Sequence, residues 1–223
     1  EVAAALHIQD HAHTCEVEDL LDVPTFLDVE KRIAQALLET VHASRDTVDP
    51  KSVGDIVVDR QAGHWVSSSS VPESQRKARY AVYEGIKLAA QFLHLRNEYE
   101  SGFDFPDLKA MYTGYETHLY RFDQMYRLFC ENADVAAAQG WDMLKPLRDD
   151  IEACYCNWYL PTLGLAWGKF VDAQLPAKWE VDGIPNQYEF FNRQVKPWLA
   201  EADNRRAFVI ISDAMRYEVA QEL

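Results

Sequence analysis

Apolar residues recur every three or four positions along most of this chain, and that spacing is typical of amphipathic helices. The stretch DVPTFLDVEKRIAQALLETVHA carries apolar residues on one face at Phe26, Val29, Ile33, Leu37 and Val41. A later stretch predicts a long helix from about Glu73 to about Tyr99. Its inward face is predicted to hold Val82, Ile86, Ala89 and Leu93.

Other residues mark where helices start, bend and stop. Asp49 is followed by Pro50, and this pair predicts a helix start, because aspartate caps free backbone N–H groups and proline needs no donor in the first turn. Pro161 and Pro197 are predicted to bend or stop their helices, since the proline ring clashes with the preceding turn. Gly114 is predicted to weaken its helix by about 1 kcal/mol relative to alanine.

In two segments the apolar residues recur with the regular spacing of helices that pack side by side, and the line of contact between such helices is called the seam below. In the first, apolar residues alternate in steps of four and three from Leu108 to Ala133. In the second, after Gly140, the same spacing joins Leu147, Ile151, Cys154 and Trp158. A repeat of about 3.5 residues keeps one side of a helix against its partner. The two segments are therefore predicted to pack as long antiparallel helices.

The pattern changes near the carboxyl end, where Ala207 to Ile211 form an apolar run rich in β-branched residues. Such a short run, bounded by charged residues, predicts a strand buried on both faces, as in a parallel sheet. A single strand cannot form a sheet. Its partners are therefore expected beyond Leu223, and the chain is expected to be a fragment.

The predicted fold class is mainly α: a multi-helix bundle with long antiparallel helices, ending in the first strand and helix of a truncated α/β domain. Three regions are predicted, namely an acidic helical segment over 1–66, a long-helix bundle or linker over 71–203, and the start of the α/β domain over 205–223. The loop AGHWVSSSSVPES marks the first boundary, because it is rich in serine and breaks the helical pattern.

The net negative charge of the chain limits the kinds of molecule that it is expected to bind. The chain has 223 residues and a formal net charge of -14, which opposes contact with nucleic acid at long range. Residues 1–50 hold eleven acidic and three basic side chains, a net charge of -8, so this region suits either a basic protein partner or solvent alone. The dense basic patch SQRKARY, which includes Arg76, Lys77 and Arg79, is interpreted as a solvated face or a partner contact.

The apolar runs, the first twenty residues and the cysteine count indicate in which cellular compartment the protein is expected. No apolar run reaches the roughly 20 residues that span a bilayer, and residues 1–20 lack the basic start and apolar middle of a signal peptide. Four cysteines in a chain of this size do not suggest a disulfide framework. A cytoplasmic protein without membrane contact is expected.

Asp213 is the first candidate for chemistry, because it lies two residues after the predicted strand. Functional groups gather at the carboxyl ends of strands in open α/β sheets, and a carboxylate there can bind a divalent metal ion through oxygen. The alternative is that Asp213 caps the helix that follows. The spacing alone favours the cap, since strand–aspartate–helix junctions are common.

Two other clusters contain metal-binding groups. HIQDHAHTC brings together His7, His11, His13 and Cys15, but it lacks the two separated ligand pairs of a zinc finger. Cys154 and Cys156 have no second cysteine pair and lie among apolar residues, which is typical of buried structural cysteines. Ordinary polar or packing roles are the simpler interpretation of both.

The segment AFVIISDAMRYEVAQEL resembles the opening of the PglZ domain, a branch of the alkaline phosphatase superfamily. The match is carried by Phe208 to Ile211, Ser212, Asp213, Ala214, Arg216, Tyr217 and Glu218. The stretches QGWDMLKPLRDDIEACYCNWYL, LAWGKFVD and PNQYEFFNRQVKPWL also resemble the region before that domain in PglZ proteins of BREX phage-defence systems. The resemblance is strong over roughly the last third of the chain and looser before it.

The resemblance implies that Asp213 is a ligand of a paired divalent metal site, usually zinc, in an alkaline-phosphatase-like domain. It also implies a Ser or Thr nucleophile and further Asp and His ligands beyond residue 223. No catalytic residue is assigned within the chain, and no metal is expected in it alone. Arg216 could reach a phosphate or pair with a nearby carboxylate; Tyr217 is expected to pack, and Glu218 to lie on the surface.

The functional expectation is a helical scaffold or interaction region of a BREX protein whose full-length form is a metal-dependent phosphohydrolase, acting as a phosphatase, phosphodiesterase or nuclease. The implied partners are other BREX proteins, with BrxB the first choice, and phage DNA reached through the full complex. Two alternatives stay open. One is a stand-alone helical module that binds nucleic acid, and the other is a chain that hydrolyses by itself, with Asp213 and the His7–Cys15 cluster holding a metal.

Overall fold

The computed structural model describes residues 2–174, 178–201 and 206–223, and over these residues the chain is mainly helical, as the pattern predicts. No strand forms within those ranges. The chain divides into two compact units. The first unit holds Glu1–Ser101 and Phe122–Leu160, and the second unit holds Gly102–Arg121 and Pro161–Leu223. The predicted boundaries near residues 66–71 and 203–205 stay predictions.

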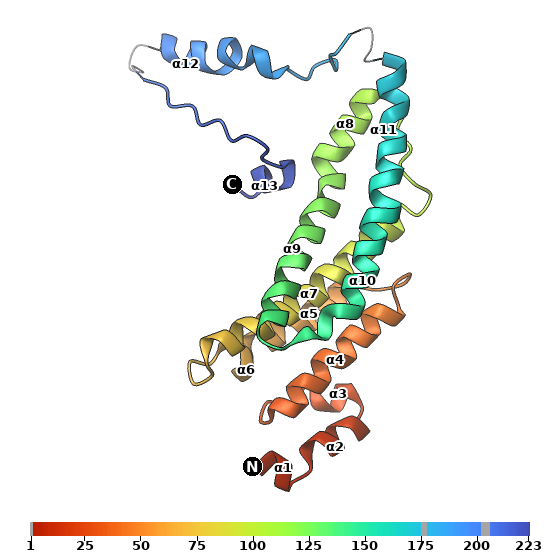
Figure 1. Cartoon of the computed structure of the whole chain (residues 1–223), viewed down its shortest axis with the longest axis vertical. Helices are drawn as coiled ribbons and strands as arrows, with labels where there is room; N and C mark the ends of the chain where they lie inside the picture. The colour runs from red at the N-terminus through yellow and green to blue at the C-terminus, as the bar shows by residue number, and fades with distance from the viewer. Residues whose placement is uncertain (1, 175–177, 202–205) are drawn as a thin grey trace. The chain divides into compact units, whose positions relative to one another are not determined.

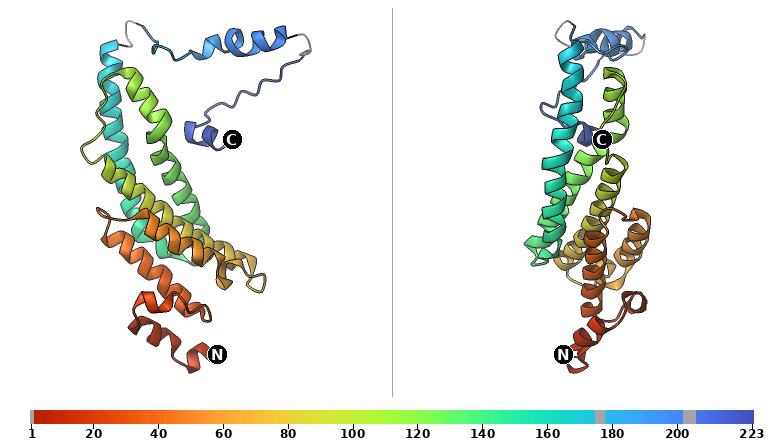
Figure 2. Two further views of the ribbon diagram at one scale, coloured as in Figure 1. Left: turned by 180° about the vertical axis from the view of Figure 1, so that it is seen from behind. Right: turned by 90° about the vertical axis from the view of Figure 1, so that its right-hand side faces the viewer.

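The first unit is built around α7, the longest of its helices (Figure 1). Helices α4, α5, α6 and α10 contact α7, and α2 and α3 contact α4. The views in Figure 2 show α2, in red, beside α4, in orange. The bounds are α1 Val2–Ala5, α2 Ile8–Thr14, α3 Val17–Leu20, α4 Leu27–Ala43, α5 Pro50–Ala62, α6 His64–Ser67, α7 Glu73–Glu98, η2 Asp142–Leu144, α10 Lys145–Cys154 and η3 Tyr155–Tyr159.

The two best-marked helices of this unit confirm the sequence prediction. In α4 and α7, the apolar residues predicted to face inward are buried: Val29, Ile33, Leu37, Val41, Val82, Ile86, Ala89 and Leu93. The Asp49 side chain caps α5 by accepting hydrogen bonds from the backbone nitrogens of Lys51 at 3.0 Å and Ser52 at 3.3 Å. These bonds, with Lys51 first, lower the pKa of Asp49, because they favour the ionised carboxylate.

A buried ion pair lies between α4, α5 and α7. The Arg60 guanidinium contacts the Glu30 carboxylate and also donates to the Leu21 carbonyl at 2.8 Å. The hydroxyl of Tyr83 donates to Oε1 of Glu30 at 2.7 Å. Removal from water strongly raises the pKa of Tyr83, because the phenolate is the charged form. Each of these polar groups therefore has a partner that offsets its loss of water.

Arg79 corrects the interpretation of the basic patch. This side chain is 2% exposed and does not belong to a solvated face. Its guanidinium donates to the Trp65 carbonyl at 3.0 Å and to Oε1 of Gln75 at 2.9 Å. It also lies over the Trp65 and Trp141 rings, 5.6 and 5.3 Å from their centroids. Planar guanidinium stacks readily on aromatic rings, so Arg79 supports the loop around α6.

The predicted antiparallel seam exists, and Leu147 and Ile151 on its second side are buried as predicted. In the first unit, Phe122 of α9 (Tyr120–Ala138) packs against Tyr159 at 4.6 Å between ring centroids, and Tyr126 stacks on Tyr155 at 3.9 Å. The opposite numerical order of these pairs makes the two segments antiparallel. Beyond Ile151 the buried positions are Tyr155 and Tyr159, whereas Cys154 and Trp158 are half-buried. The Trp158 ring still contacts Phe122, with 5.7 Å between the ring centroids, as its predicted place in the seam requires. The π turn η3 accommodates one extra residue after Tyr155.

The second unit contains the remaining helices and the carboxyl-terminal segment. Its bounds are α8 Leu108–Gly114, η1 Tyr115–Leu119, the first turn of α9, α11 Leu160–Gln174, η4 Gln187–Glu189, η5 Phe191–Val195, α12 Lys196–Ala200 and α13 Tyr217–Gln221. None of the helices in the described ranges is both long enough and apolar enough to cross a membrane.

Pro161 does not stop its helix, whereas the helix that contains Pro197 ends three residues after it, as predicted. Pro161 is followed by α11 to Gln174, and Pro197 lies within α12. Each comes two residues after a π turn, η3 or η5. In both turns, the backbone N–H of the residue before proline donates a hydrogen bond to the carbonyl five residues earlier. Leu160 donates to Tyr155, and Lys196 donates to Phe191. The wider turn makes room for a residue that has no N–H and a bulky ring.

Gly114 has a packing role that its helix propensity does not reveal. A Cβ placed on Gly114 would overlap the ring of Phe105. Alanine would improve helix propensity by about 1 kcal/mol, but it would displace that ring. The glycine therefore makes room for the loop that carries Phe105, instead of only weakening the helix.

Candidate functional site

The predicted strand at Ala207–Ile211 is extended but is neither paired nor buried. Within the described parts of the chain no segment hydrogen-bonds to it as a ladder. Phe208, Ile210 and Ile211 are 89%, 93% and 89% exposed, and Val209 is 49% exposed. Burial on both faces is therefore not confirmed in this chain and stays a prediction. The physical reason is that the neighbours in a sheet bury a strand, and the described residues supply none.

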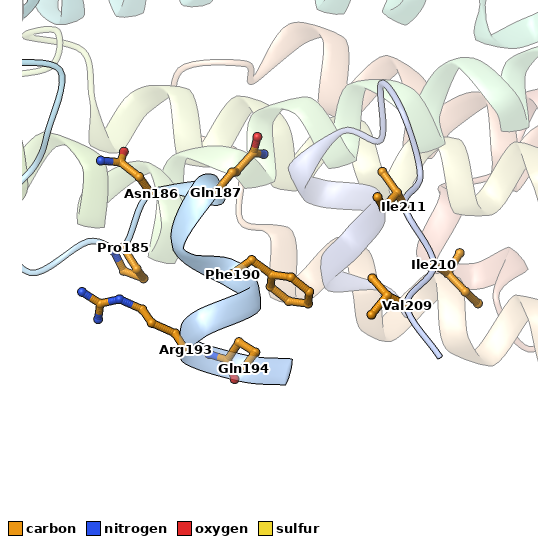
Figure 3. A pocket seen from close by; sticks show the side chains of 9 residues that line it. All are labelled: Pro185, Asn186, Gln187, Phe190, Arg193, Gln194, Val209, Ile210 and Ile211. Carbon is orange, nitrogen blue, oxygen red and sulfur yellow. The ribbon is translucent and has the colours of Figure 1, made fainter. Parts of the chain in front are cut away.

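The extended segment lines a cavity of about 500 Å³ together with the turn of helix around η4 and η5. Figure 3 shows the Phe190 ring pointing toward the side of the segment that carries Val209 and Ile211, while Ile210 lies on the opposite side. This alternation is the side-chain arrangement of a β-strand. The cavity wall is otherwise formed by Pro185, Asn186, Gln187, Arg193 and Gln194.

Asp213 lies in an exposed turn directly after the extended segment. Ala214, the next residue, has a φ of 58°, a left-handed conformation that a residue with a side chain adopts rarely and that tightens this turn. Helix α13 begins at Tyr217, and its N-cap residue is Arg216 with no side-chain cap bond. The interpretation of Asp213 as a helix cap is therefore wrong.

The Asp213 carboxylate has no hydrogen bond or ion pair with any residue that the structure describes. A solvated carboxylate held by a tight turn fits the chemistry of a ligand for a hard or borderline divalent ion. One carboxylate does not make a metal site. Over the described ranges, no three His, Cys, Asp or Glu side chains gather where they could hold an ion. Asp213 stays a predicted ligand whose fellow ligands are not among these residues.

The three residues Arg216, Tyr217 and Glu218 form a small anchored group. Nε of Arg216 lies 2.7 Å from Oε1 of Glu218, which confirms pairing with a nearby carboxylate. Glu218 is fully buried, so its predicted surface position is wrong. Tyr217 packs, as predicted, with its ring 5.8 Å from Tyr115 and 5.5 Å from Tyr120 between centroids.

In the described residues, the fold brings no further metal-binding side chains to the His7–Cys15 cluster or to the Cys154 and Cys156 pair. His7 is the residue before α2, in a left-handed conformation, and its Nδ1 lies 3.5 Å from Asp10. Cys15 and Cys156 are exposed, and Cys154 is half-buried. Burial raises the pKa of the Cys154 thiol to about 11, which works against the thiolate that metal binding or nucleophilic attack requires.

Residues 190–223 match the family model of the BREX system PglZ alkaline phosphatase-like domain. Over its whole length the chain is 38% identical to the alkaline phosphatase-like protein BrxZ of Escherichia coli O9:H4 (strain HS) and covers 25% of that protein. It is likewise 28% identical to the alkaline phosphatase-like protein PglZ of Bacillus cereus (strain H3081.97) and covers 24% of it. The chain is therefore similar to PglZ-family proteins along its whole length.

This similarity covers the whole chain, although the chain spans only about a quarter of the length of these two curated relatives. The family model takes in η5, α12, the extended segment and Asp213. The helices before residue 190 are covered by the similarity to the two relatives. No solved structure matches the chain.

Proposed function

We propose that this chain is the helical interaction region of a BREX phage-defence protein and that it leads into a metal-dependent phosphohydrolase domain, which acts as a phosphatase, phosphodiesterase or nuclease in the cytoplasm. The observation that carries the proposal is the match of residues 190–223 to the PglZ alkaline phosphatase-like domain, with an unengaged Asp213 inside it. The similarity of the whole chain to BrxZ and PglZ proteins supports it.

Asp213 is proposed to bind one of a pair of divalent metal ions, with zinc the first choice. The extended residues before it would pair with strands from outside this chain, and the pairing would bury the apolar side chains that are now exposed. Two metal ions in such a domain can activate a nucleophile and stabilise the attacking and leaving oxygens of a phosphoryl transfer. The remaining ligands and the nucleophile are proposed to lie outside these residues, so the chain alone is expected to be inactive.

The test of this role is an Asp213→Asn substitution in the intact protein, with Asp182→Asn as the control. Both carboxylates are exposed in the second unit, and both variants lose one negative charge. Metal content after dialysis and hydrolysis of a phosphodiester dye are measured. We expect Asp213→Asn to bind zinc at least about tenfold more weakly and to lose hydrolysis, while Asp182→Asn keeps both. An Asp213→Asn protein with normal metal content and activity would overturn the role.

The helical region is proposed to bind other BREX proteins, with BrxB the first choice, and to approach phage DNA only through the assembled complex. The acidic residues of the first unit support a basic protein surface as partner: Asp10, Glu16, Glu18, Asp19 and Asp22 are exposed. Direct DNA binding has less support, because Arg79 of the basic patch is buried.

The acidic surface can be tested by substituting Glu16→Gln, Glu18→Gln and Asp19→Asn together. Binding of the intact protein to purified BrxB is measured by calorimetry at two salt concentrations. An electrostatic contact predicts weaker binding by the triple variant and a smaller dependence on salt. The control neutralises the exposed acids Glu180 and Asp182 in the second unit. Equal affinity and equal salt dependence of all three proteins would remove the acidic surface from the proposal.

A further inference from the structure

Tyr217 is held in place by two hydrogen bonds of its hydroxyl group and by contacts of its ring. The hydroxyl donates to the backbone carbonyl of Glu116 at 3.1 Å and accepts from Nε2 of Gln221 at 2.6 Å. Its ring lies against Tyr115 and Tyr120. All of these residues belong to the second unit. Partial removal from water raises the pKa of Tyr217, which keeps the hydroxyl protonated and able to donate.

The acceptor of that hydrogen bond lies in the π turn η1. In an α-helix the carbonyl of Glu116 would accept from the N–H of Tyr120, four residues later. Here the N–H of Tyr120 donates instead to the carbonyls of Tyr115 and His118. The Glu116 carbonyl therefore lacks its usual donor at that position, and the Tyr217 hydroxyl donates to it. Single π turns inside α-helices are frequent at functional sites.

The segment anchored in this way is short and directly follows the candidate ligand. Asp213 precedes Tyr217 by four residues, and the tight turn at Ala214 lies between them. On the other side of Tyr217, Glu218 is fully buried and its carboxylate pairs with Arg216. A five-residue helix such as α13 is not stable by itself. Its position depends on the groups that attach it to the rest of the second unit.

We propose that the π turn η1 is a docking site for Tyr217 and that this contact sets the position of Asp213. Tyr217 is thus a positioning residue, and helix α8–η1–α9 is the support against which the metal-binding end of the PglZ domain is placed. The second half of this proposal rests on the proposed role of Asp213 as a metal ligand. The first half, the docking, does not depend on any activity.

The decisive variant is Tyr217→Phe in the intact protein, because it removes the hydroxyl and keeps the ring between Tyr115 and Tyr120. Tyr80→Phe is the matched control, since the Tyr80 side chain is 48% exposed and lies on α7 in the other unit. Hydrogen exchange of the backbone amides of residues 219–221 is followed by mass spectrometry. Loss of one hydrogen bond is expected to speed their exchange about fivefold, with no change in Tyr80→Phe.

The second measurement is steady-state hydrolysis of a phosphodiester dye by the zinc-loaded protein. If Tyr217 positions Asp213, Tyr217→Phe lowers kcat about threefold to tenfold, because small misplacements of a reacting group are costly. KM and the overall melting temperature are expected to stay at the wild-type values. A structural role alone would leave kcat unchanged.

The outcomes separate the two halves of the proposal. Unchanged exchange in Tyr217→Phe overturns the docking. Faster exchange with unchanged kcat confirms the docking and overturns the positioning of Asp213. A wild-type protein that neither binds zinc nor hydrolyses the dye overturns the proposed function, while the exchange measurement still decides the docking.

Discussion

Gly85 of α7 passes so close to Leu144 that a Cβ built on the glycine would lie 2.7 Å from Cδ1 of that leucine. Leu144 is 2% exposed and is held by η2 against α7. A glycine in the middle of a helix costs about 1 kcal/mol relative to alanine. At this position the missing methyl group is what lets the leucine reach the core.

Gly85→Ala is therefore expected to lower the free energy of unfolding by about 1–3 kcal/mol, because the added methyl group overpacks the core. Urea denaturation followed by circular dichroism measures the change. Gly54→Ala is the control, since Gly54 lies inside α5 and a Cβ there would meet nothing within 4 Å. That variant is expected to gain up to about 1 kcal/mol. Equal stabilisation by both substitutions would contradict the packing argument.

The Arg60–Glu30 pair predicts a large loss when only one partner is removed. Arg60→Met leaves a buried carboxylate without its cation, and the free energy of unfolding is expected to fall by about 3–5 kcal/mol. Tyr83→Phe removes one hydrogen bond to the same carboxylate and is expected to cost about 1 kcal/mol. Both are measured by chemical denaturation.

The control for this pair is Lys77→Met, which breaks an ion pair with Glu73 in which both side chains are 69% exposed. No measurable loss is expected, because water screens such pairs. The double variant Glu30→Met with Arg60→Met should recover much of the stability lost in Arg60→Met, since no unpaired charge stays buried. A double variant no more stable than the single one would contradict this.

Cysteine labelling tests the burial of Cys154 against that of its neighbour. With a pKa of about 11 for Cys154, only about one thiol in a thousand is thiolate at pH 8, so alkylation by iodoacetamide is slow. Cys156 is exposed and is expected to react first. Labelling of Cys154 should rise as the pH approaches 11, because the thiolate forms there. Mass spectrometry of digested protein measures both sites, and equal rates at pH 8 would contradict the assignment.

The exposed extended segment predicts self-association of the 223-residue chain. Unpaired backbone and apolar side chains at Phe208, Ile210 and Ile211 offer an edge on which a second copy can pair. Ile210→Lys is expected to reduce this association, which sedimentation velocity at several protein concentrations would measure. Val58→Lys is the control, because Val58 is also exposed, at 61%, but lies on a helix. Equal association of both variants would contradict the role of the segment.

Helices whose apolar residues all meet one core were predictable from the sequence. In α4 and α7 the spacing alone identifies the buried face, since packing and periodicity agree. The burial of Tyr155 was not predictable from the spacing, because steps of three and of four residues both fit a helical seam, so Ile151 can be followed by Cys154 or by Tyr155. The burial of Arg79 was not predictable either, because its charge suggests contact with solvent and the Trp65 and Trp141 rings that cover it are not its neighbours in the sequence.

For the candidate site, sequence resemblance located Asp213 but not its surroundings. Spacing favoured a helix cap, yet α13 starts four residues later, so the carboxylate stays unengaged. The role of Tyr217 depends on a carbonyl 101 positions away in the chain, and no local pattern carries that information. The extended conformation of Ala207–Ile211 was predictable from β-branched residues, whereas its burial depends on strands that these residues do not supply.

The π turn before Pro197 has a consequence for comparing members of the family. Because η5 contains one residue more than an α-helical turn would, removing that residue would rotate Trp198 by about 100° around the helix axis relative to Phe190. A relative without this proline has no need of the extra residue. Alignments of such relatives should therefore show a gap of a single position here, and a gap opened elsewhere in the helix would pair the wrong aromatic residues.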